Sequence, residues 1–299
     1  MRHRHTAADW AMLLGLVVMW GSAFMLTKIA VAGIAPDLIA ASRLLVASLL
    51  LLPAARLFAG RPAHGRKLWL FMLLIAVFGY ALPFSLISWG QAFIASGLAS
   101  ILMAIMPLAT LGLAHFLIPG ERLTPYRVGG FILGFAGVVV LMGPSVWSGL
   151  ANGENPRLPM LAVLGGAFSY AVSSVLARLR PAGDALFTGA ATTSLAALML
   201  LPLAIPSLSL ETATRPTTAQ ITAVVLLGIV STALAAILYF RLVKSAGPAF
   251  VSQLNYLIPP WAVGCGILFL GETLEPNHLY ALGLILAGVL ATHLERVRR

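Results

Sequence analysis

The sequence has few charged residues and almost no cysteine. Only 9% of its 299 residues are Asp, Glu, Lys or Arg, whereas 60% are hydrophobic. A soluble globular domain has about a quarter of its residues charged. The composition therefore excludes an ordinary soluble protein and indicates an integral membrane protein. The one cysteine, Cys265, excludes an internal disulfide framework and a metal site built from several thiolates.

The motifs that mark common enzyme active sites are also absent. The chain has no HExxH, GxGxxG, GxxxxGK[ST] or GxSxG pattern and no pair of membrane aspartates. We therefore expect no catalytic residue, no metal ion and no cofactor. A membrane-embedded enzyme is the less favoured alternative.

Acidic residues are missing from the interior of the apolar segments. Six lie at predicted helix ends and the rest in predicted loops or the tail: Asp9, Asp37, Glu121, Asp184, Glu272 and Glu275, then Glu154, Glu211 and Glu295. Proton-coupled pumps usually place a carboxylate or histidine in the transport path. We interpret His115 as a packing residue, and the pattern favours transport without obligatory proton coupling.

Long apolar runs fill most of the chain. A bilayer core about 30 Å thick needs roughly 20 apolar residues per helix. Ten windows of that kind can be placed, so we expect an all-α integral membrane protein with ten transmembrane helices. They are 9–32, 36–57, 68–91, 96–118, 125–143, 158–179, 184–206, 219–242, 248–270 and 277–294.

The basic residues fall mainly on one side of these predicted helices. That side holds most of the 19: Arg2, Arg4, Arg56, Arg61, Arg66, Lys67, Arg122, Arg127, Arg178, Arg180, Arg241, Lys244, Arg296, Arg298 and Arg299. Arg157 and Arg215 would lie on the other side. Because basic loops stay cytoplasmic, both termini are predicted in the cytoplasm of a multi-pass protein of the bacterial plasma membrane. Topology and lipid headgroups thus explain the net charge of +10, with no nucleic-acid partner.

The sequence pattern of residues 96–121 is repeated, with changes, in residues 248–272. In both stretches a serine, Ser100 or Ser252, precedes a proline, Pro107 or Pro259, by seven positions, and each stretch ends in Gly-Glu. The predicted units are 1–148 and 149–299, each with five helices. Because five is odd, the second unit enters the membrane from the opposite face, which predicts an inverted 5+5 repeat. Such repeats are typical of secondary transporters with a substrate site at mid-membrane.

Four prolines lie inside predicted helices. Each removes a backbone hydrogen bond and frees a carbonyl group that needs a partner away from lipid. We expect helix breaks or gates beside a cavity, with a simple kink as the alternative. The prolines are Pro83, Pro107, Pro259 and Pro260.

Aromatic and neutral polar residues at mid-depth are candidate substrate contacts. Aromatic rings would bind an apolar or aromatic group, and uncharged polar groups would hold amino and carboxylate groups. The candidates are Trp20, Phe24, Tyr80, Gln91, Ser100, Met103, Tyr170, Ser173, Ser252, Asn255 and Tyr256. The alternatives are buried packing and interhelical hydrogen bonds, worth about 0.6 kcal/mol each. Asn255 and Tyr256 replace Met103 and Ala104 of the first copy, so the second copy is expected to hold more of the ligand's hydrogen bonds.

Lys28 and Arg43 are the cations placed within predicted helices. They could attract a carboxylate or hold an external gate through Glu272. The alternative is that their long side chains reach the membrane surface or pair structurally.

Gly130 and Gly134 form a GxxxG pattern, extended by Gly137. This spacing lets two helix backbones approach closely. We expect a close helix contact within the chain, with a dimer face as the alternative, and therefore a monomer or a weak homodimer.

Together these patterns resemble the EamA branch of the drug/metabolite transporter superfamily. The resemblance is carried by WGSAF at 20–24, Arg43, and the two stretches 107–121 and 259–272, and it covers essentially the whole chain. It implies ten helices around a central cavity. The third, fourth and sixth helices form one wall, the eighth, ninth and first the mirrored wall, and the fifth and tenth stand at the sides. In one departure from symmetry, the first copy has one more residue between its proline and its glutamate.

The resemblance also implies an exporter of amino acids, aromatic ones favoured, or of related small metabolites, working by alternating access. Broad efflux of drugs is the alternative, although export of lipophilic cations calls for a membrane carboxylate. Transport of nucleotide sugars or other metabolites stays open.

Overall fold

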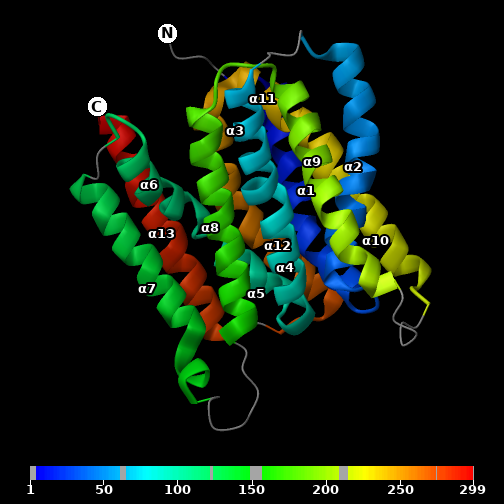
Figure 1. Ribbon diagram of the computed structural model, residues 1–299. Helices are drawn as coiled ribbons and strands as arrows, with labels where there is room; N and C mark the ends of the chain where they lie inside the picture. Colours follow the sequence, from blue (N-terminus) through cyan, green and yellow to red (C-terminus); the bar gives the residue numbers. More distant parts are fainter. Residues whose placement is uncertain are drawn as a thin grey trace.

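The computed structural model describes residues 5–60, 65–121, 124–148, 157–208, 215–273 and 275–298. Within these ranges every regular element is helical (Figure 1). Several charged residues used above lie outside them: Arg2, Arg4, Arg61, Arg122, Arg299, Glu154 and Glu211.

The first half begins with two long helices, α1 (Ala7–Val31) and α2 (Pro36–Phe58). Then come α3 (Arg66–Ala76), the π-helical segment η1 (Val77–Ala81) and α4 (Leu82–Phe93), which follow one another without a gap. The last elements of this half are α5 (Ser96–Met103), α6 (Met106–Leu117) and α7 (Pro125–Ser148).

The second half begins with α8 (Arg157–Leu179) and α9 (Ala185–Leu208). A second continuous series joins α10 (Thr218–Gly228), the π-helical segment η3 (Ile229–Leu234) and α11 (Ala235–Val251). The chain finishes with α12 (Leu254–Leu270) and α13 (Pro276–Arg298). Because α13 runs to Arg298, Glu295 lies in its last turn rather than in a tail.

Membrane-spanning character follows from length and composition. Among the described residues, 7 helices are long and apolar enough to cross a membrane, and three shorter apolar helices cover Pro125–Leu141, Leu254–Leu270 and Pro276–Ala291. Many large apolar side chains are exposed on the outside of the bundle, Leu49, Phe135 and Leu268 among them. In a soluble protein such a surface would be unstable, whereas lipid tails cover it favourably. The chain is therefore a multi-pass membrane protein.

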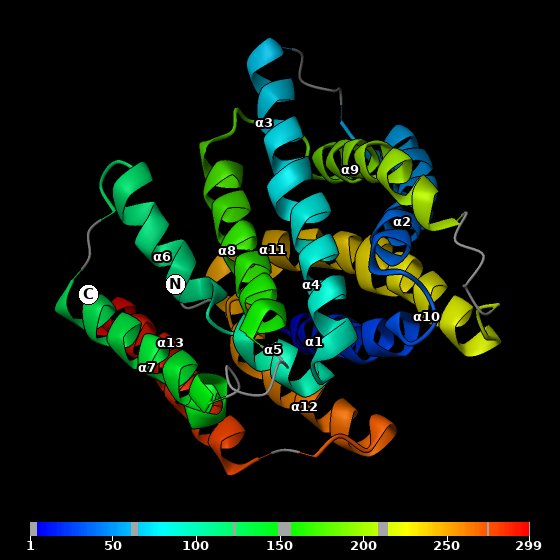
Figure 2. The ribbon, with the colours of Figure 1, turned by 60° about the horizontal axis from the view of Figure 1, so that its bottom comes forward.

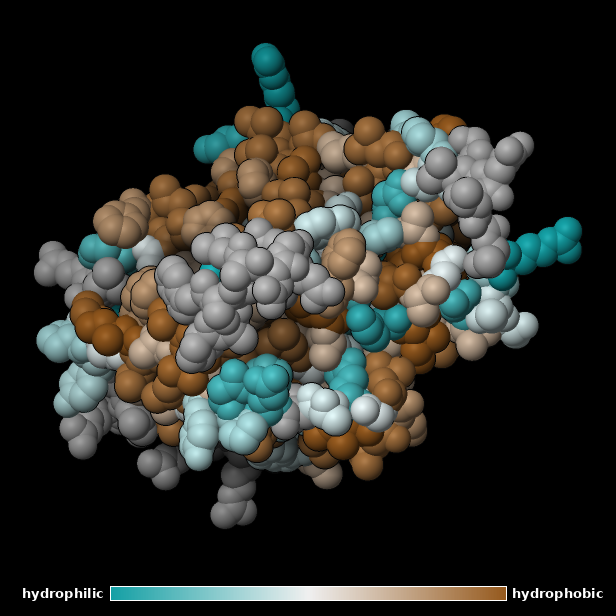
Figure 3. Space-filling model, turned by 90° about the horizontal axis from the view of Figure 1, so that it is seen from below, coloured by the Kyte–Doolittle hydropathy of each residue, from teal (hydrophilic) through white to brown (hydrophobic). Residues whose placement is uncertain are grey.

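Both chain ends lie at the same end of the bundle (Figure 1). We call this end the termini end and the opposite one the far end. α1 starts at the termini end with a capping box, in which Thr6 N donates to Asp9 Oδ2 at 2.9 Å and Asp9 N donates to Thr6 Oγ1 at 3.2 Å. Seen from the far end, hydrophilic residues interrupt a largely hydrophobic surface (Figure 3).

α7 and α13 form a closely packed pair at the edge of the bundle (Figure 2). A Cβ atom added at Gly288 would lie 2.5 Å from the carbonyl oxygen of Gly130, and one at Gly137 would lie 2.7 Å from Ile285 Cγ1. The predicted close contact of the GxxxG pattern is thus confirmed within the chain. These glycines lie between α7 and α13, the two helices that the family resemblance places at the side of the bundle.

The two π-helical segments occupy corresponding places in the two halves. Val77 and Ile229, their first residues, are 152 positions apart, which is also the separation of Ser100 and Ser252. α3 and α10, the helices before them, are each 11 residues long. A π turn inside an α-helix is rare and often marks a functional site. Both segments lie in the middle of a long helical run.

The helix breaks differ between the halves. α5 ends at Met103 and α6 begins at Met106, directly before Pro107, as predicted. In the second half the break lies at Ser252 and Gln253, after a kink at Gly247 with a φ of 81°. Pro259 and Pro260 lie inside α12, which corrects the expectation that they mark the break. The carbonyl groups that would otherwise accept from these two positions belong to Asn255 and Tyr256, in the first turn of α12.

Pro83 is the second residue of α4 and directly follows the π turn of η1. Proline is tolerated in the first turn of a helix because its missing N–H group has no partner there. The wider π turn before Pro83 likewise accommodates its missing N–H group, so the helix continues through the proline. The predicted interruption at Pro83 therefore takes the form of a π segment rather than a gap.

Candidate functional site

Arg43 lies in the middle of α2, enclosed by neighbouring helices. Its Nε donates a hydrogen bond to Thr232 Oγ1 at 2.8 Å, and its Cζ lies 3.9 Å from the ring centroid of Phe84. A guanidinium group over an aromatic face is attracted by the negative charge of that face. Thr232 lies in η3 and Phe84 in α4. Arg43 therefore joins three helical runs at the centre of the bundle.

The local structure of η3 places the threonine. Thr232 Oγ1 donates to the carbonyl oxygen of Leu227, five residues earlier, at 2.8 Å. Its oxygen thus remains free to accept from Arg43. Gly228 lets this run approach α2, because an added Cβ would lie 2.6 Å from Val46 and 3.0 Å from the Arg43 carbonyl oxygen.

Tyrosine rings continue from Phe84. Tyr80 of η1 lies 6.0 Å from Phe84 and Tyr170 of α8 lies 6.4 Å from it, both edge to face. Tyr80 occupies the position of η1 that corresponds to Thr232 in η3, 152 residues later. Both π segments therefore bring a hydroxyl-bearing side chain to the neighbourhood of Arg43.

Trp20 of α1 lies on the other side of η3. Its Nε1 donates to the carbonyl oxygen of Ser231 at 3.2 Å, and its ring lies 5.5 Å from that of Tyr239. Ser231 Oγ in turn donates to the carbonyl oxygen of Met19 at 2.9 Å. The π segment η3 thus supplies contacts both to α1 and to Arg43.

Several side chains at this depth keep some accessible surface although helices surround them. Arg43, Trp20, Tyr80, Tyr170 and Ser173 are all partly exposed, whereas many of their apolar neighbours, such as Leu44 and Ala76, are fully buried. Polar groups with accessible surface inside a bundle indicate space for water or a solute. We call these five residues with Thr232 and Phe84 the central cluster.

Some predicted site residues are used between helices instead. Gln91 is fully buried, and its Nε2 donates to the carbonyl oxygen of Phe24 at 2.9 Å. Ser100 Oγ donates to the carbonyl oxygen of Gly97 in its own helix at 2.7 Å. Phe24 packs against the apolar cluster around Ile101. These contacts hold α1, α4 and α5 together.

The remaining predicted contacts lie beside the helix breaks. Met103 is the last residue of α5, Ser252 follows α11, and Asn255 and Tyr256 are in the first turn of α12. All four are partly exposed. Their part in binding stays a prediction.

The far end is closed by Glu272, which follows α12. Its Oε1 accepts from Ser96 N at 2.6 Å, and its Oε2 accepts from Gly97 N at 2.9 Å and from Ser96 Oγ at 3.0 Å. A carboxylate at a helix N-terminus binds unpaired N–H groups and the positive end of the helix dipole. Glu272 therefore fastens α12 to the start of α5, a contact that we call the far-end clasp.

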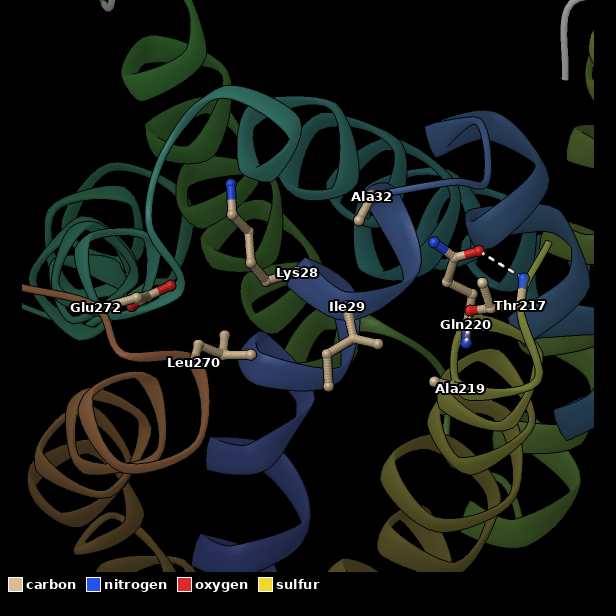
Figure 4. A pocket seen from close by; sticks show the side chains of 8 residues that line it. All are labelled: Lys28, Ile29, Ala32, Thr217, Ala219, Gln220, Leu270 and Glu272. Atoms are coloured by element: carbon tan, nitrogen blue, oxygen red, sulfur yellow. Dashed lines mark hydrogen bonds between the residues drawn. The ribbon is translucent and has the colours of Figure 1, made fainter. Parts of the chain in front are cut away.

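Lys28 and Glu272 line a hollow of about 430 Å³ at the same end. Figure 4 shows them on one side of it and Gln220 and Thr217 of α10 on the other. Lys28 Nζ donates to the carbonyl oxygen of Gln91 at 2.8 Å. Lys28 thus holds the end of α4 and lies apart from the central cluster.

The described residues form no equivalent clasp at the termini end. Glu121 corresponds to Glu272, but its carboxylate binds Arg127 at 3.0 Å and Arg178 at 3.4 Å. α5 packs against α12 at the far end, whereas α6 has no comparable packing with α11 or α12 in the described parts of the chain. Figure 2 shows α6 standing apart from α11. A clasp at a helix start is thus described at the far end, whereas the termini end is joined by side-chain contacts such as Ser245 Oγ to Asp9 Oδ1 at 2.7 Å and Arg178 to Glu121 at 3.4 Å.

Three residues of the site were not among the predicted contacts: Phe84, Thr232 and Tyr239. Phe84 is an aromatic residue near the middle of a predicted helix, four residues after Tyr80, and packing was the favoured interpretation for it. Thr232 and Tyr239 lie within the same predicted helix, 219–242, and a polar residue followed seven positions later by an aromatic one was the available signal.

A family model matches the chain twice. The description is EamA-like transporter family, and the matched residues are 9–143 and 157–294. The chain belongs to this family. The drug/metabolite transporter resemblance inferred from the residues is therefore correct.

Relatives across nearly the whole chain are transporters by name. A probable terminal-alkyne amino-acid exporter of Streptantibioticus cattleyicolor is 31% identical and covers 95% of this chain and 92% of its own length. A probable amino-acid metabolite efflux pump of Salmonella typhimurium is 29% identical, with 94% and 93% covered. The uncharacterized inner membrane transporter YedA of Escherichia coli is 28% identical, with 97% and 92% covered. This EamA protein is accordingly a membrane transporter.

A similar fold is found among solved structures. A crystal structure at 19% sequence identity aligns with a TM-score of 0.63 and covers 98% of this chain and 99% of the other. At that identity the likeness concerns the fold alone.

Proposed function

We propose that this EamA transporter exports amino acids, with aromatic ones favoured, or related small metabolites, by alternating access. The observation that carries the proposal is the central cluster, in which partly exposed tyrosine, tryptophan and hydroxyl side chains lie around Arg43, itself partly exposed and enclosed by helices. Aromatic rings suit an aromatic side chain, and polar groups suit the amino and carboxylate groups. The names of two relatives, an amino-acid exporter and an amino-acid metabolite efflux pump, support the same substrate class.

The proposed architecture is ten transmembrane helices in an inverted 5+5 repeat, with units 1–148 and 149–299. Two matches to one family model, the corresponding π segments and the glutamates at 121 and 272 support it. Both termini are proposed to lie in the cytoplasm. The far-end clasp would then close the outer side, and the conformation is inward-facing.

Transport is proposed to need no obligatory proton exchange. The described residues of the central cluster include no carboxylate and no histidine, and Asp9 and Asp37 lie in the first turns of their helices. Pumps that move protons through the membrane usually need such a group.

Counterflow in proteoliposomes tests the proposal. The purified full-length protein is reconstituted, loaded with each of the twenty amino acids, several cationic drugs or nucleotide sugars, and exchanged against labelled compound. Aromatic amino acids should exchange fastest, and collapse of the pH gradient should leave their rate unchanged. Exchange of a drug or nucleotide sugar without any amino acid would contradict the substrate class. A rate abolished by loss of the pH gradient alone would contradict the coupling.

Trp20→Ala and Tyr80→Ala should alter the preference among amino acids if these rings line the path. Phe135→Ala, which removes an exposed ring on the outside of α7, is the matched control. A change in expression without a change in preference would assign Trp20 and Tyr80 to packing.

A further inference from the structure

We infer that Arg43 is the carboxylate-binding residue of the transport path, so that the transporter selects substrates with a free carboxylate. This inference rests on the proposed function and names the substrate chemistry of the same site. It begins from the hydrogen bonds of the guanidinium group. An arginine side chain has five N–H donors, one on Nε and four on the two terminal nitrogens.

The protein uses one of these donors. Nε binds Thr232 Oγ1 at 2.8 Å, and the flat face of the group lies over Phe84. In the described part of the chain, the terminal nitrogens have neither a hydrogen-bond acceptor nor an acidic partner. Buried charges are normally paired, because an unpaired charge is expensive to remove from water. Four donors in a rigid fork thus remain available for a ligand.

The way Arg43 is held suits a carboxylate in particular. Thr232 fixes one edge of the guanidinium group and Phe84 fixes its plane, so the terminal nitrogens point in a defined direction. Two parallel N–H donors match the two oxygens of a carboxylate. Tyr80 and Tyr170 stand around the same ring. They provide aromatic surface and hydroxyl groups beside the place where the carboxylate would lie.

The positive charge of Arg43 would also discriminate between amino acids and cationic drugs. A positive group without a neighbouring acid repels cations and attracts anions in a low-dielectric interior. The amino group of an amino acid would be accepted by tyrosine rings and hydroxyl groups. A lipophilic cation without a carboxylate would gain nothing to offset the repulsion. The central cluster therefore favours amino acids and disfavours cationic drugs.

Lys28 is a poor candidate for this role, although it is the other cation in the predicted helices. Its ammonium group donates to the carbonyl oxygen of Gln91 and lies in the hollow with Glu272 at the far end. It is thus placed at the outside of the clasp, away from the aromatic rings of the central cluster.

The test compares L-phenylalanine with L-phenylalaninamide, which lacks the carboxylate. Counterflow is measured for the wild type, Arg43→Gln, Arg43→Lys and the control Arg56→Gln, which makes the same change at an exposed position of the same helix. Arg43→Gln should lower kcat/KM for phenylalanine by between about 10-fold and 100-fold, chiefly through KM, because a hydrogen-bonded charge is lost. The same substitution should spare or raise transport of the amide. The kcat/KM of Arg43→Lys for phenylalanine should lie between those of the wild type and Arg43→Gln. The kcat/KM of Arg56→Gln should match that of the wild type.

An equal loss for both compounds in folded Arg43→Gln protein, or no loss for phenylalanine, would overturn the inference. Thr232→Val supplies a second variant that keeps the charge. It should raise KM for phenylalanine by several-fold, and Thr232→Ser should restore it, since Thr232 acts as a positioning residue.

Failure of the proposed function is recognised separately. If the wild type exchanges no amino acid, the proposed substrate class is lost, but binding of 3-phenylpropionate to the purified protein still tests Arg43. The compound should raise the thermal stability of the wild type and of Arg56→Gln but not of Arg43→Gln. An equal shift in all three proteins would overturn the carboxylate role on its own.

Discussion

The two ends of the bundle carry the same residue in different settings. Glu272 at the far end and Glu121 at the termini end each follow a glycine with positive φ, 64° at Gly271 and 86° at Gly120. Glu272 binds the first turn of α5, whereas Glu121 binds Arg127 and Arg178. Glu272 thus binds backbone donors at the start of a helix, whereas Glu121 is held by two arginine side chains, Arg127 of α7 and Arg178 of α8, and joins the two halves through Arg178.

The residues opposite each glutamate explain the difference. Glu272 binds two backbone N–H groups and one hydroxyl, supplied by Ser96 and Gly97. The position that corresponds to Ser96, 152 residues later, is Pro248. Proline has neither an N–H group nor a hydroxyl. A clasp at the termini end would therefore have fewer donors, which favours the state closed at the far end.

Glu272→Gln is expected to have the largest effect. It removes the charge from three hydrogen bonds, each worth about 1.5 to 3 kcal/mol when one partner is charged. The population open at the far end should rise by more than about tenfold. Spin labels at Phe93→Cys and Leu268→Cys, both exposed, in a Cys265→Ser background would report a longer distance. An unchanged distance distribution would show that the clasp does not hold the end closed.

Ser96→Pro should act in the same direction with a smaller effect. It places at position 96 the proline that the second half has at Pro248. This removes the backbone donor and the hydroxyl of Ser96 and leaves Gly97 N as the donor to Glu272. The substitution is compatible with the fold because Ser96 is the first residue of α5, where proline is favoured. The same spin-label pair should show roughly tenfold more open population. Ser96→Ala, which keeps the backbone donor, is the control and should open the end less.

Pro248→Ser is the reciprocal change. It supplies a backbone donor and a hydroxyl for Glu121, and should increase the population closed at the termini end by a few-fold, roughly 1 kcal/mol. Glu121 must leave Arg127 and Arg178 to reach them, which limits the gain. Labels at Phe116→Cys and Lys244→Cys, in the Cys265→Ser background, should move closer together. A shift of equal size in a Pro248→Ser, Glu121→Gln double variant would show that Glu121 is not the acceptor.

Glu121→Gln alone should have the smallest effect. Glu121 has 26% of its side chain exposed, and its partners Arg127 and Arg178 have 16% and 51% exposed. Such ion pairs contribute about 0 to 1 kcal/mol. Thermal unfolding should change little, and the far-end distance should stay as in the wild type. A far-end shift as large as that of Glu272→Gln would remove the distinction between the two glutamates.

Much of the fold was predictable from the sequence because it follows from apolar length. The predicted windows overlap the observed helices, and 125–143 with 277–294 became the closely packed pair that Gly130 and Gly134 indicated. The break before Pro107 was also predictable. The break at Ser252 and Gln253 was not, since the proline pair lies one helical turn or more beyond it.

The site was predictable only in part. Trp20, Tyr80, Tyr170 and Arg43 were recognised because aromatic and charged residues are conspicuous in apolar segments. Their arrangement depends on contacts between distant parts of the chain, such as Arg43 with Thr232 and Glu272 with Ser96. The π segments have no periodic signal here, because the runs around them are apolar at nearly every position, so the shift in phase that one extra residue causes cannot be seen. Gln91 was a candidate ligand contact with an interhelical hydrogen bond as the alternative, and its amide joins α1 to α4.

The π segments also carry information about descent. A π turn is one residue more than an α turn in the same helix. On the proposed repeat, η1 and η3 begin at equivalent positions, yet within VFGYA at 77–81 and the first five residues of IVSTAL at 229–234 only the final alanines, Ala81 and Ala233, are identical. A single insertion in the unduplicated ancestor explains both turns, whereas separate origins require the same event twice. On the proposed repeat, the backbone irregularity is shared by two segments whose residues differ.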